Sequence, residues 1–156
     1  SGVHAIKPTA TVLTAYLGNW DDVSAGKELA LALIQRGADV IFQNADAAGL
    51  GVFQAAKERQ GIAVIGSNSN QNGVAPGLVL GSVVIDLPHA FLLVAKEVAG
   101  GTFRGRVIPL GMRDDVVRWE PAEVLLTRLP PAFAARMDST RLAMQAGRFP
   151  MPALTP

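Results

Sequence analysis

The chain has 156 residues, enough for one domain with a sizeable hydrophobic core. Apolar residues make up 49% of it and the formal net charge is +1, which argues against disorder and against nucleic acid or an anionic membrane as a partner. The chain has no cysteine and its two histidines, His4 and His89, lie far apart. We therefore expect no disulfide, no metal site and no cofactor.

The first half of the chain predicts three buried strands that alternate with two helices. Runs of apolar and β-branched residues predict strands at 11–17, 39–45 and 62–67. Apolar residues at helical spacing predict helices at 23–36 and 51–60, each closed by a glycine. This alternation implies a parallel sheet with right-handed crossovers, and the lack of polar alternation in the strands implies helices on both faces.

The second half predicts further elements of the same α/β kind. Residues 78–85 predict a fourth strand, and a helix follows at 88–98 with a proline near its first position. Residues 107–112 predict a short edge strand, since Pro109 cannot donate to a ladder. A helix is predicted at 131–145, and the proline-rich end of the chain is expected to trail over the surface.

Polar residues follow each of the first three predicted strands. They are Asn19, Trp20, Asp21 and Asp22 after the first, Asn44 and Asp46 after the second, and Asn68, Asn70 and Gln71 after the third. The carboxyl ends of parallel strands meet at one edge of the sheet, where open α/β sheets bind ligands. Amide groups both donate and accept hydrogen bonds, so they suit a neutral heterocycle or a sugar better than a phosphate or a metal ion.

Several of these residues have a structural alternative. Trp20 is either a platform for a stacked ring or a staple onto the next helix, and we favour stacking. Asp21 and Asp22 favour helix capping, whereas capping and ligand contact are equally supported for Asp46. Asn68 is either a turn former or a ligand contact, and we favour the contact because the residue directly follows a strand.

Catalysis has little support in the sequence. Ser67 and Ser82 lack a histidine in the context of a catalytic triad. Nothing in the sequence forces Asp46 and Asp86 together as an acid–base pair. We therefore expect a binding protein rather than an enzyme.

The order YLGNWDD, GADVIFQNADAAGLGVFQAAKE, GSNSNQ, VLGSVVIDLP and GTFRGRVIPLGM resembles the basic-membrane-protein (BMP, also Med or PnrA-like) family of ABC-transporter substrate-binding proteins. The match runs from about Thr11 to Val117. The resemblance implies the three-layer α/β, parallel-sheet C-terminal lobe of a type I periplasmic-binding fold. It also implies a purine nucleoside or related base as ligand, an ABC permease as partner, and a periplasmic or membrane-anchored extracellular lipoprotein.

The resemblance also implies roles for individual residues. Trp20 stands at the family's ring-stacking aromatic, Asn68 at its ribose-binding Asp, and Asp46 and Ala47 at a Gly-Gly pair. Residues 80–85 stand at the family's L-T-S-x-x-K hinge segment. The expected ligand-binding residues are Asn19, Trp20, Asn44, Asp46, Ala47, Asn68, Gln71 and Ser82.

Three departures from the family pattern bear on the ligand. Asn68 replaces an Asp that would accept two sugar hydroxyls, and Ile85 replaces a Lys. Asp46 introduces a carboxylate that could accept ring N–H groups. A free purine or a related heterocycle is therefore an alternative to a nucleoside.

We divide the chain into a ligand-binding lobe at 9–85, a hinge crossover with its helix at 86–117, and a C-terminal helical tail at 118–156. A whole family member has about twice this length. The apolar helix at 88–98 is expected to pack on the absent N-terminal lobe or on another copy, which predicts a homo-oligomer. A ligand-sensing or oligomeric interaction module and, less favoured, an enzyme are the competing functions.

Overall fold

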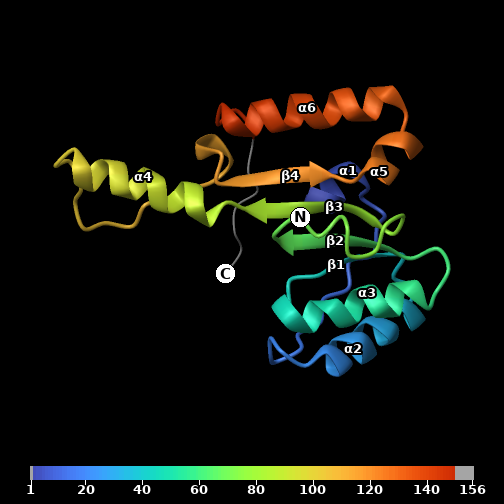
Figure 1. Ribbon diagram of the computed structural model, residues 1–156. Coiled ribbons are helices and arrows are strands. Elements are labelled where there is room, and N and C mark those ends of the chain that lie inside the picture. Colours follow the sequence, from blue (N-terminus) through green and yellow to red (C-terminus); the bar gives the residue numbers. More distant parts are fainter. Residues whose placement is uncertain (1, 150–156) are drawn as a thin grey trace.

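Four short strands form one sheet in the computed structural model, which describes residues 2–149 (Figure 1). The strands are β1 (Val40–Phe42), β2 (Ala63–Asn68), β3 (Val79–Ile85) and β4 (Val117–Pro121), in spatial order β1-β2-β3-β4. The first three strands run parallel, and β4 runs antiparallel to β3. The sheet is therefore mostly parallel, and the carboxyl ends of β1, β2 and β3 share one edge.

Two helices, α2 (Val23–Gln35) and α3 (Gly49–Lys57), pack on each other and form one layer. The two helices approach closely because glycines, which have no side chain, stand at two positions of the contact. A Cβ atom at Gly26 would collide with the carbonyl oxygen of Ala48, and one at Gly51 with that of Val23. A one-turn 3-10 helix, η1 (Asp46–Ala48), leads into α3.

The hydrophobic core lies between this helical layer and the sheet. Phe53, Val64 and Val79 are almost fully buried there, together with small residues of α2 and α3. The core spans α2, α3, β1, β2 and β3, so it fixes the positions of the strand ends that carry the polar residues.

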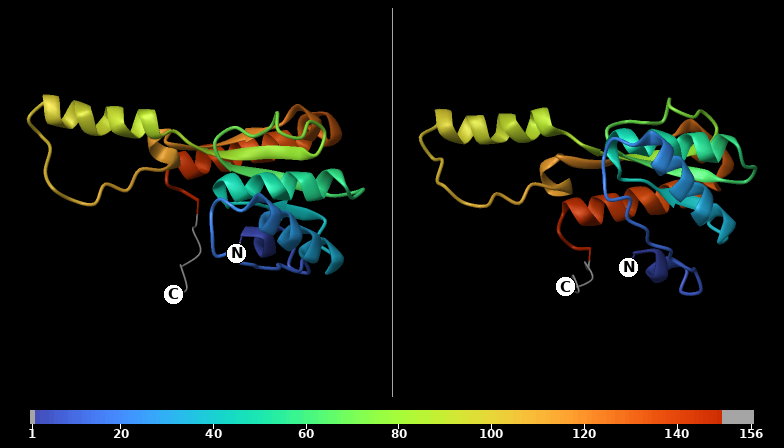
Figure 2. Two further views of the ribbon diagram at one scale, coloured as in Figure 1. Left: turned by 60° about the horizontal axis from the view of Figure 1, so that its bottom comes forward. Right: turned by 90° about the horizontal axis from the view of Figure 1, so that it is seen from below.

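A second helical layer lies across the opposite side of the sheet (Figure 2). It consists of α5 (Glu123–Arg128) and α6 (Pro131–Gln145). A cavity of about 560 Å³ lies between Trp119 and Pro121 of β4 and Phe133 and Met137 of α6. The molecule is thus a three-layer α/β lobe, as the sequence predicts.

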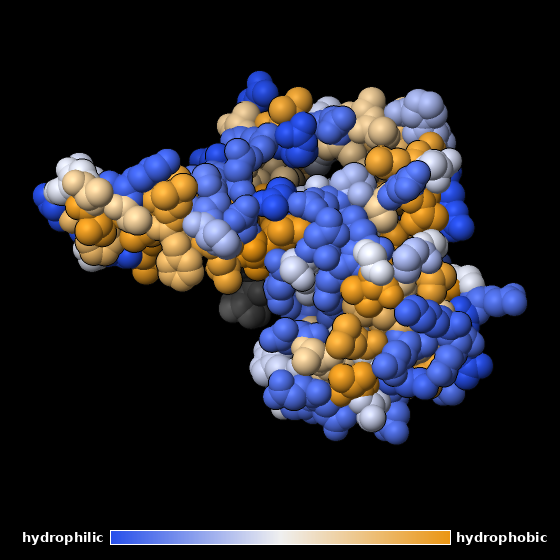
Figure 3. Space-filling view, viewed as in Figure 1, coloured by the Kyte–Doolittle hydropathy of each residue, from blue (hydrophilic) through white to orange (hydrophobic). Residues whose placement is uncertain are grey.

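Helix α4 (Leu87–Ala99) projects away from the sheet as an arm (Figures 1 and 2). The chain returns along residues 100–111 and a second 3-10 helix, η2 (Met112–Asp114). Leu87, Phe91, Leu92 and Val98 are all exposed on α4. Figure 3 shows apolar side chains gathered along this arm.

Two predicted strands are wrong. Residues 11–17 are extended, with Leu13 and Leu17 half-buried, but they form no ladder with any described residue. β1 is the end strand of the sheet and pairs with β2 alone among the described residues, so residues 11–17 lie outside the sheet without pairing to the open side of β1. Residues 107–112 also form no strand, and the last strand of the sheet comes later, at β4.

The remaining predicted elements are present with small shifts of their ends. The sequence did not predict α5 or the short α1 (Gly2–Ile6). The predicted trailing end falls mostly outside the described residues. None of the helices within 2–149 combines the length and apolar content that a bilayer crossing requires.

Candidate functional site

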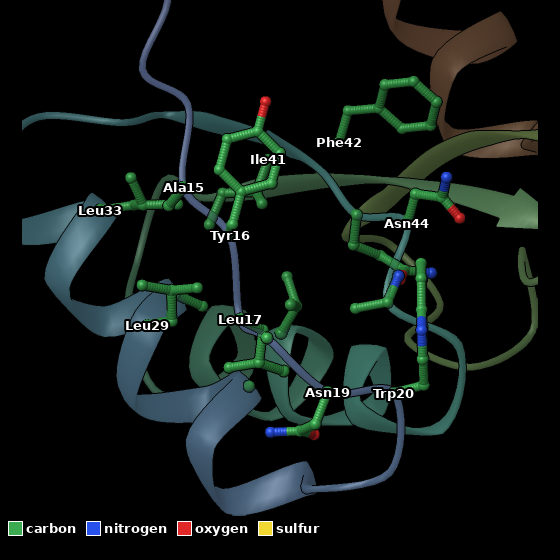
Figure 4. Close-up of a pocket in the computed structure, with 16 residues that line it drawn as sticks. Ala15, Tyr16, Leu17, Asn19, Trp20, Leu29, Leu33, Ile41, Phe42 and Asn44 are labelled. Atoms are coloured by element: carbon green, nitrogen blue, oxygen red, sulfur yellow. The ribbon is translucent and has the colours of Figure 1, made fainter.

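A cavity of about 400 Å³ lies along the outer side of β1 and reaches the carboxyl end of that strand at Asn44 and Ala45 (Figure 4). Its walls come from residues 15–20, from α2 and from residues 41–45. Leu29, Leu33 and Ile41 form apolar walls, and none of the lining residues that the structure describes is charged. The cavity can therefore hold an uncharged, partly apolar molecule.

Three aromatic rings stand around this cavity. Trp20 is 59% exposed, Tyr16 is 91% exposed and Phe42 is 59% exposed. A staple packed onto α2 would bury the Trp20 indole, so its exposure fits the stacking alternative better. Tyr16 and Phe42 were not predicted as site residues because each lies in a segment whose sequence predicts a buried strand.

The turn that carries Trp20 is held by local hydrogen bonds. The Asn19 side-chain oxygen accepts the N–H groups of Asp21 at 3.2 Å and Asp22 at 2.9 Å. The Asp22 carboxylate in turn caps α2 by accepting the Ala25 N–H at 2.9 Å. The Asn19 side-chain oxygen therefore stabilises the turn. Asp22 is the helix cap that the sequence predicts.

The ends of β1 and β2 place two residues in the left-handed backbone region. Asp46 has a φ of 50° and Asn68 a φ of 65°. Such conformations are unfavourable for residues other than glycine, and they concentrate at binding sites. The Asn68 amide lies 3.4 Å from the side-chain oxygen of Asn44, so the two exposed asparagines meet across the strand ends.

Asp46 and Ala47 are exposed directly after this point, in η1. No side chain among the described residues caps η1, so Asp46 does not act there as a helix cap. The Asp46 side chain is exposed. The capping alternative for Asp46 is therefore not realised, and its contact with a ligand stays a prediction.

A buried network of amides and hydroxyls lies behind the exposed asparagines. Gln43, only 4% exposed, donates from Nε2 to Gln71 Oε1 at 2.6 Å. Gln71 Oε1 also accepts the Ser67 N–H at 3.0 Å, and the Gln71 N–H donates to Ser82 Oγ at 3.0 Å. Ser82 Oγ donates onward to Asn72 at 2.8 Å. The network ties the loop after β2 to both neighbouring strands.

Of the eight sequence-predicted residues, six lie at the cavity or the adjoining surface and two lie behind them. Asn19, Trp20 and Asn44 line the cavity, and Asp46, Ala47 and Asn68 are exposed at the adjoining strand ends. Gln71 and Ser82 belong to the network behind them, and Ser82 is fully buried. These two side chains hold the loop in place, and Ser82 has no surface with which to touch a ligand.

Glu120, which contacts this loop through Asn70, belongs to a cluster of ionised groups around Arg118. Its guanidinium pairs with Asp86 at 2.9 Å and with Glu120 at 2.8 Å. The pKa of Asp86 is lowered by the hydrogen bond from the His89 N–H and then by Arg118. The pKa of Arg118 is raised by its bonds to Glu120 and Asp86. Among the described residues, no group of acidic or histidine side chains could hold a metal ion.

A parallel sheet with an amide- and aromatic-lined cavity at its carboxyl edge is the architecture of a small-molecule-binding α/β lobe. The family model described as "ABC transporter substrate-binding protein PnrA-like" matches residues 1–138. The chain belongs to this family.

Curated relatives carry related names. Basic membrane protein B of Borrelia garinii subsp. bavariensis is 34% identical over 110 residues, which are 68% of this chain and 32% of that protein. Purine-binding protein BAB2_0673 of Brucella abortus is 27% identical over 146 residues, 94% of this chain and 40% of that protein. The chain therefore spans well under half the length of these relatives.

Solved structures agree with the fold. A transcriptional activator of the comK gene from Bacillus halodurans has a TM-score of 0.74 at 26% identity, covering 87% of this chain and 47% of that one. An ABC transporter solute-binding protein from Conexibacter woesei has a TM-score of 0.72 at 23% identity, covering 97% of this chain and 49% of that one. The second likeness shows the fold alone.

Proposed function

We propose that the chain is the ligand-binding C-terminal lobe of an ABC importer's solute-binding protein and that it takes a purine nucleoside or nucleobase. The observation that carries this proposal is the uncharged cavity beside β1, where aromatic rings and amide groups meet at the strand ends. A volume of about 400 Å³ suits a small ligand. A relative named as a purine-binding protein supports the choice of ligand.

The chemistry of the cavity matches a purine in two ways. Trp20 and Tyr16 offer flat faces on which a heterocycle can stack. Asn44 and Asn68 offer both donors and acceptors for the edge of the ring. Phosphate groups find no cation in the lining and would lie near the Asp46 carboxylate, so nucleotides are disfavoured.

The proposal also concerns the relative affinity of the site for a free purine base and for its nucleoside. Asn68 accepts fewer sugar hydroxyls than a carboxylate would, and the exposed Asp46 can accept ring N–H groups. We expect tighter binding of a free purine base than of its nucleoside. Equal affinity for hypoxanthine and inosine would count against this preference.

The test is thermal unfolding of the chain with hypoxanthine, adenine, inosine and guanosine, with uridine and inosine monophosphate as controls. A ligand at about a hundred times its Kd stabilises the folded state by roughly 2.7 kcal/mol, which raises Tm by several degrees. The purines should raise Tm, the controls should not, and Trp20→Ala should abolish the effect. The proposal fails if no purine stabilises the chain more than uridine does.

The wider partners belong to the same proposal. An ABC permease would receive the ligand from the whole protein outside the cytoplasmic membrane, and no turnover of the ligand is expected. Residues 86–117 would pack on an N-terminal lobe or on another copy of the chain, which makes a homo-oligomer through α4 the expected state of this lobe alone.

One observation favours a second candidate, a ligand-sensing module. The Bacillus halodurans protein that shares this fold is named as a transcriptional activator of the comK gene. A sensor would also bind a small molecule, so the two candidates differ in partner rather than in site. Capture of the ligand-bound chain by a permease in reconstituted vesicles would favour the importer.

A further inference from the structure

Asp86 lies between β3 and α4 and joins the base of the arm to the sheet by several hydrogen bonds. Its N–H donates to the Val116 carbonyl at 2.7 Å. Its Oδ1 accepts the His89 N–H at 2.9 Å and so caps α4, while its Oδ2 pairs with Arg118 at 2.9 Å. The rest of α4 stands clear of the sheet (Figures 1 and 2). The direction of the arm therefore depends on the bonds of Asp86.

Arg118 extends these bonds toward the binding loop. Its Nε donates to Glu120 Oε1 at 2.8 Å. The other carboxylate oxygen of Glu120 accepts the side-chain amide of Asn70 at 2.5 Å, and the Glu120 carbonyl accepts that of Asn72 at 3.3 Å. Asn70 and Asn72 lie in the loop that begins at Asn68. An unbroken run of hydrogen bonds thus connects the base of the arm with this loop.

We propose that Arg118 is a positioning residue that fixes the arm and the loop 68–72 relative to each other, so that releasing it frees both. A guanidinium is a rigid planar fork, which suits it to hold two carboxylates at a set separation. One of these carboxylates caps α4 and the other anchors Asn70. The groups are half-buried and share partners, which makes them worth more together than separate surface pairs.

The proposal does not depend on what the site binds, and it can be tested without a ligand. Because the chain has no native cysteine, two introduced cysteines can be spin-labelled cleanly. Lys96→Cys with Arg59→Cys reports the distance from the arm to α3's end, and Ser69→Cys with Arg59→Cys reports the position of the loop. All three positions are exposed. Pulsed electron paramagnetic resonance then gives both distance distributions.

In the Arg118→Met background, both distributions should broaden and shift. Arg106→Met is the matched control, because the Arg106–Glu97 pair is equally exposed but lies within the arm segment and does not reach the sheet. It should leave both distributions unchanged. The proposal is overturned if either distribution in Arg118→Met coincides with that of the parent chain.

Two further measurements cover the case in which Arg118→Met fails to fold. Asp86→Asn keeps an acceptor for the His89 N–H but weakens the pair with Arg118, so it should broaden the arm distribution while circular dichroism stays unchanged. Raising the salt to about 1 M shortens the Debye length to roughly 3 Å and should broaden both distributions in the parent chain. Unchanged distributions in both measurements would overturn the proposal.

Discussion

Single residues decide how closely the parts of the site approach one another. The α2–α3 contact brings η1 against the turn of Trp20, whose carbonyl accepts the Ala48 N–H at 2.8 Å. That contact exists because Gly26 and Gly51 lack side chains. The same glycines that pack the helices therefore also allow η1 to contact the turn that carries Trp20.

Gly51→Ala should destabilise the protein. The new methyl group would collide with the Val23 carbonyl, which is backbone and cannot turn aside. We expect a loss of roughly 1–3 kcal/mol in the free energy of unfolding, measured by urea titration. Gly73→Ala is the control, since a Cβ there meets nothing within 4 Å and should change stability by less than about 0.5 kcal/mol. Equal effects of the two changes would contradict the packing argument.

Asn68→Gly should stabilise the fold and weaken the site. Glycine adopts the left-handed conformation at φ 65° without steric cost, which should raise the free energy of unfolding by about 1 kcal/mol. Loss of the amide should weaken hypoxanthine binding about tenfold, measured by calorimetry. Ser69→Gly, next to it but without a positive φ, should not stabilise the protein. A stable variant with unchanged binding would remove Asn68 from the site.

The sequence predicted part of this residue-level picture. Asn44 and Asn68 were found because they lie at or just after the ends of β1 and β2, and parallel strands share an edge. Trp20 was found from a predicted strand at 11–17 that does not form. Tyr16 and Phe42 were missed because their exposure depends on residues 11–17 lying outside the sheet, which strand propensity cannot reveal. The burial of Ser82 likewise depends on Gln71 and Asn72 folding back over β3.

At the scale of elements, the helices were predicted best because their signals are local. Asp22 caps α2, and Gly37, with positive φ, follows the end of that helix. Helix α3 ends at Lys57, earlier than its predicted end before Gly61. Strands depend on partners that lie far away in the sequence. Residues 11–17 have the composition of a strand, yet they do not pair with the open side of β1 and form no ladder with any described residue.

The cap of α4 should make stability depend on pH. The folded-state pKa of Asp86 lies below its usual 3.8, so the carboxylate stabilises the fold above that value and the stability is lost as pH falls through the lowered pKa. His89 and Arg118 are the charged groups that face it. Tm measured from pH 7 to pH 2 should fall more steeply below 3.8 in the parent chain than in Asp86→Asn. Parallel curves would contradict this role of Asp86.

At the scale of the whole molecule, the arm exposes large apolar side chains that no other described element covers. Phe91 is 73% exposed and Val98 is 58% exposed, on a helix with no buried residue. Apolar surface of this kind usually lies at an interface. The relatives are roughly two and a half to three times as long as the matched region. Their additional length leaves room for a further lobe against the apolar face of α4.

In the isolated chain, we expect α4 to pair with α4 of a second copy. Sedimentation velocity should show concentration-dependent association, and Phe91→Glu should reduce it by placing a carboxylate in the apolar contact. Lys96→Glu introduces the same group at an exposed polar position of α4 and serves as the control. A chain that stays monomeric at tens of micromolar would contradict this expectation.

The unpaired outer edge of β1 bears on how readily the protein aggregates. Within residues 2–149, β1 pairs with β2 alone, so its other side presents free N–H and C=O groups next to the exposed Val40 and Phe42. Edges of this kind invite strands from other molecules and lead to fibrous aggregates. Here the strand is only three residues long, and η1 begins four residues after it ends. The shortness of β1 therefore limits such pairing at the edge of the lobe that also borders the cavity.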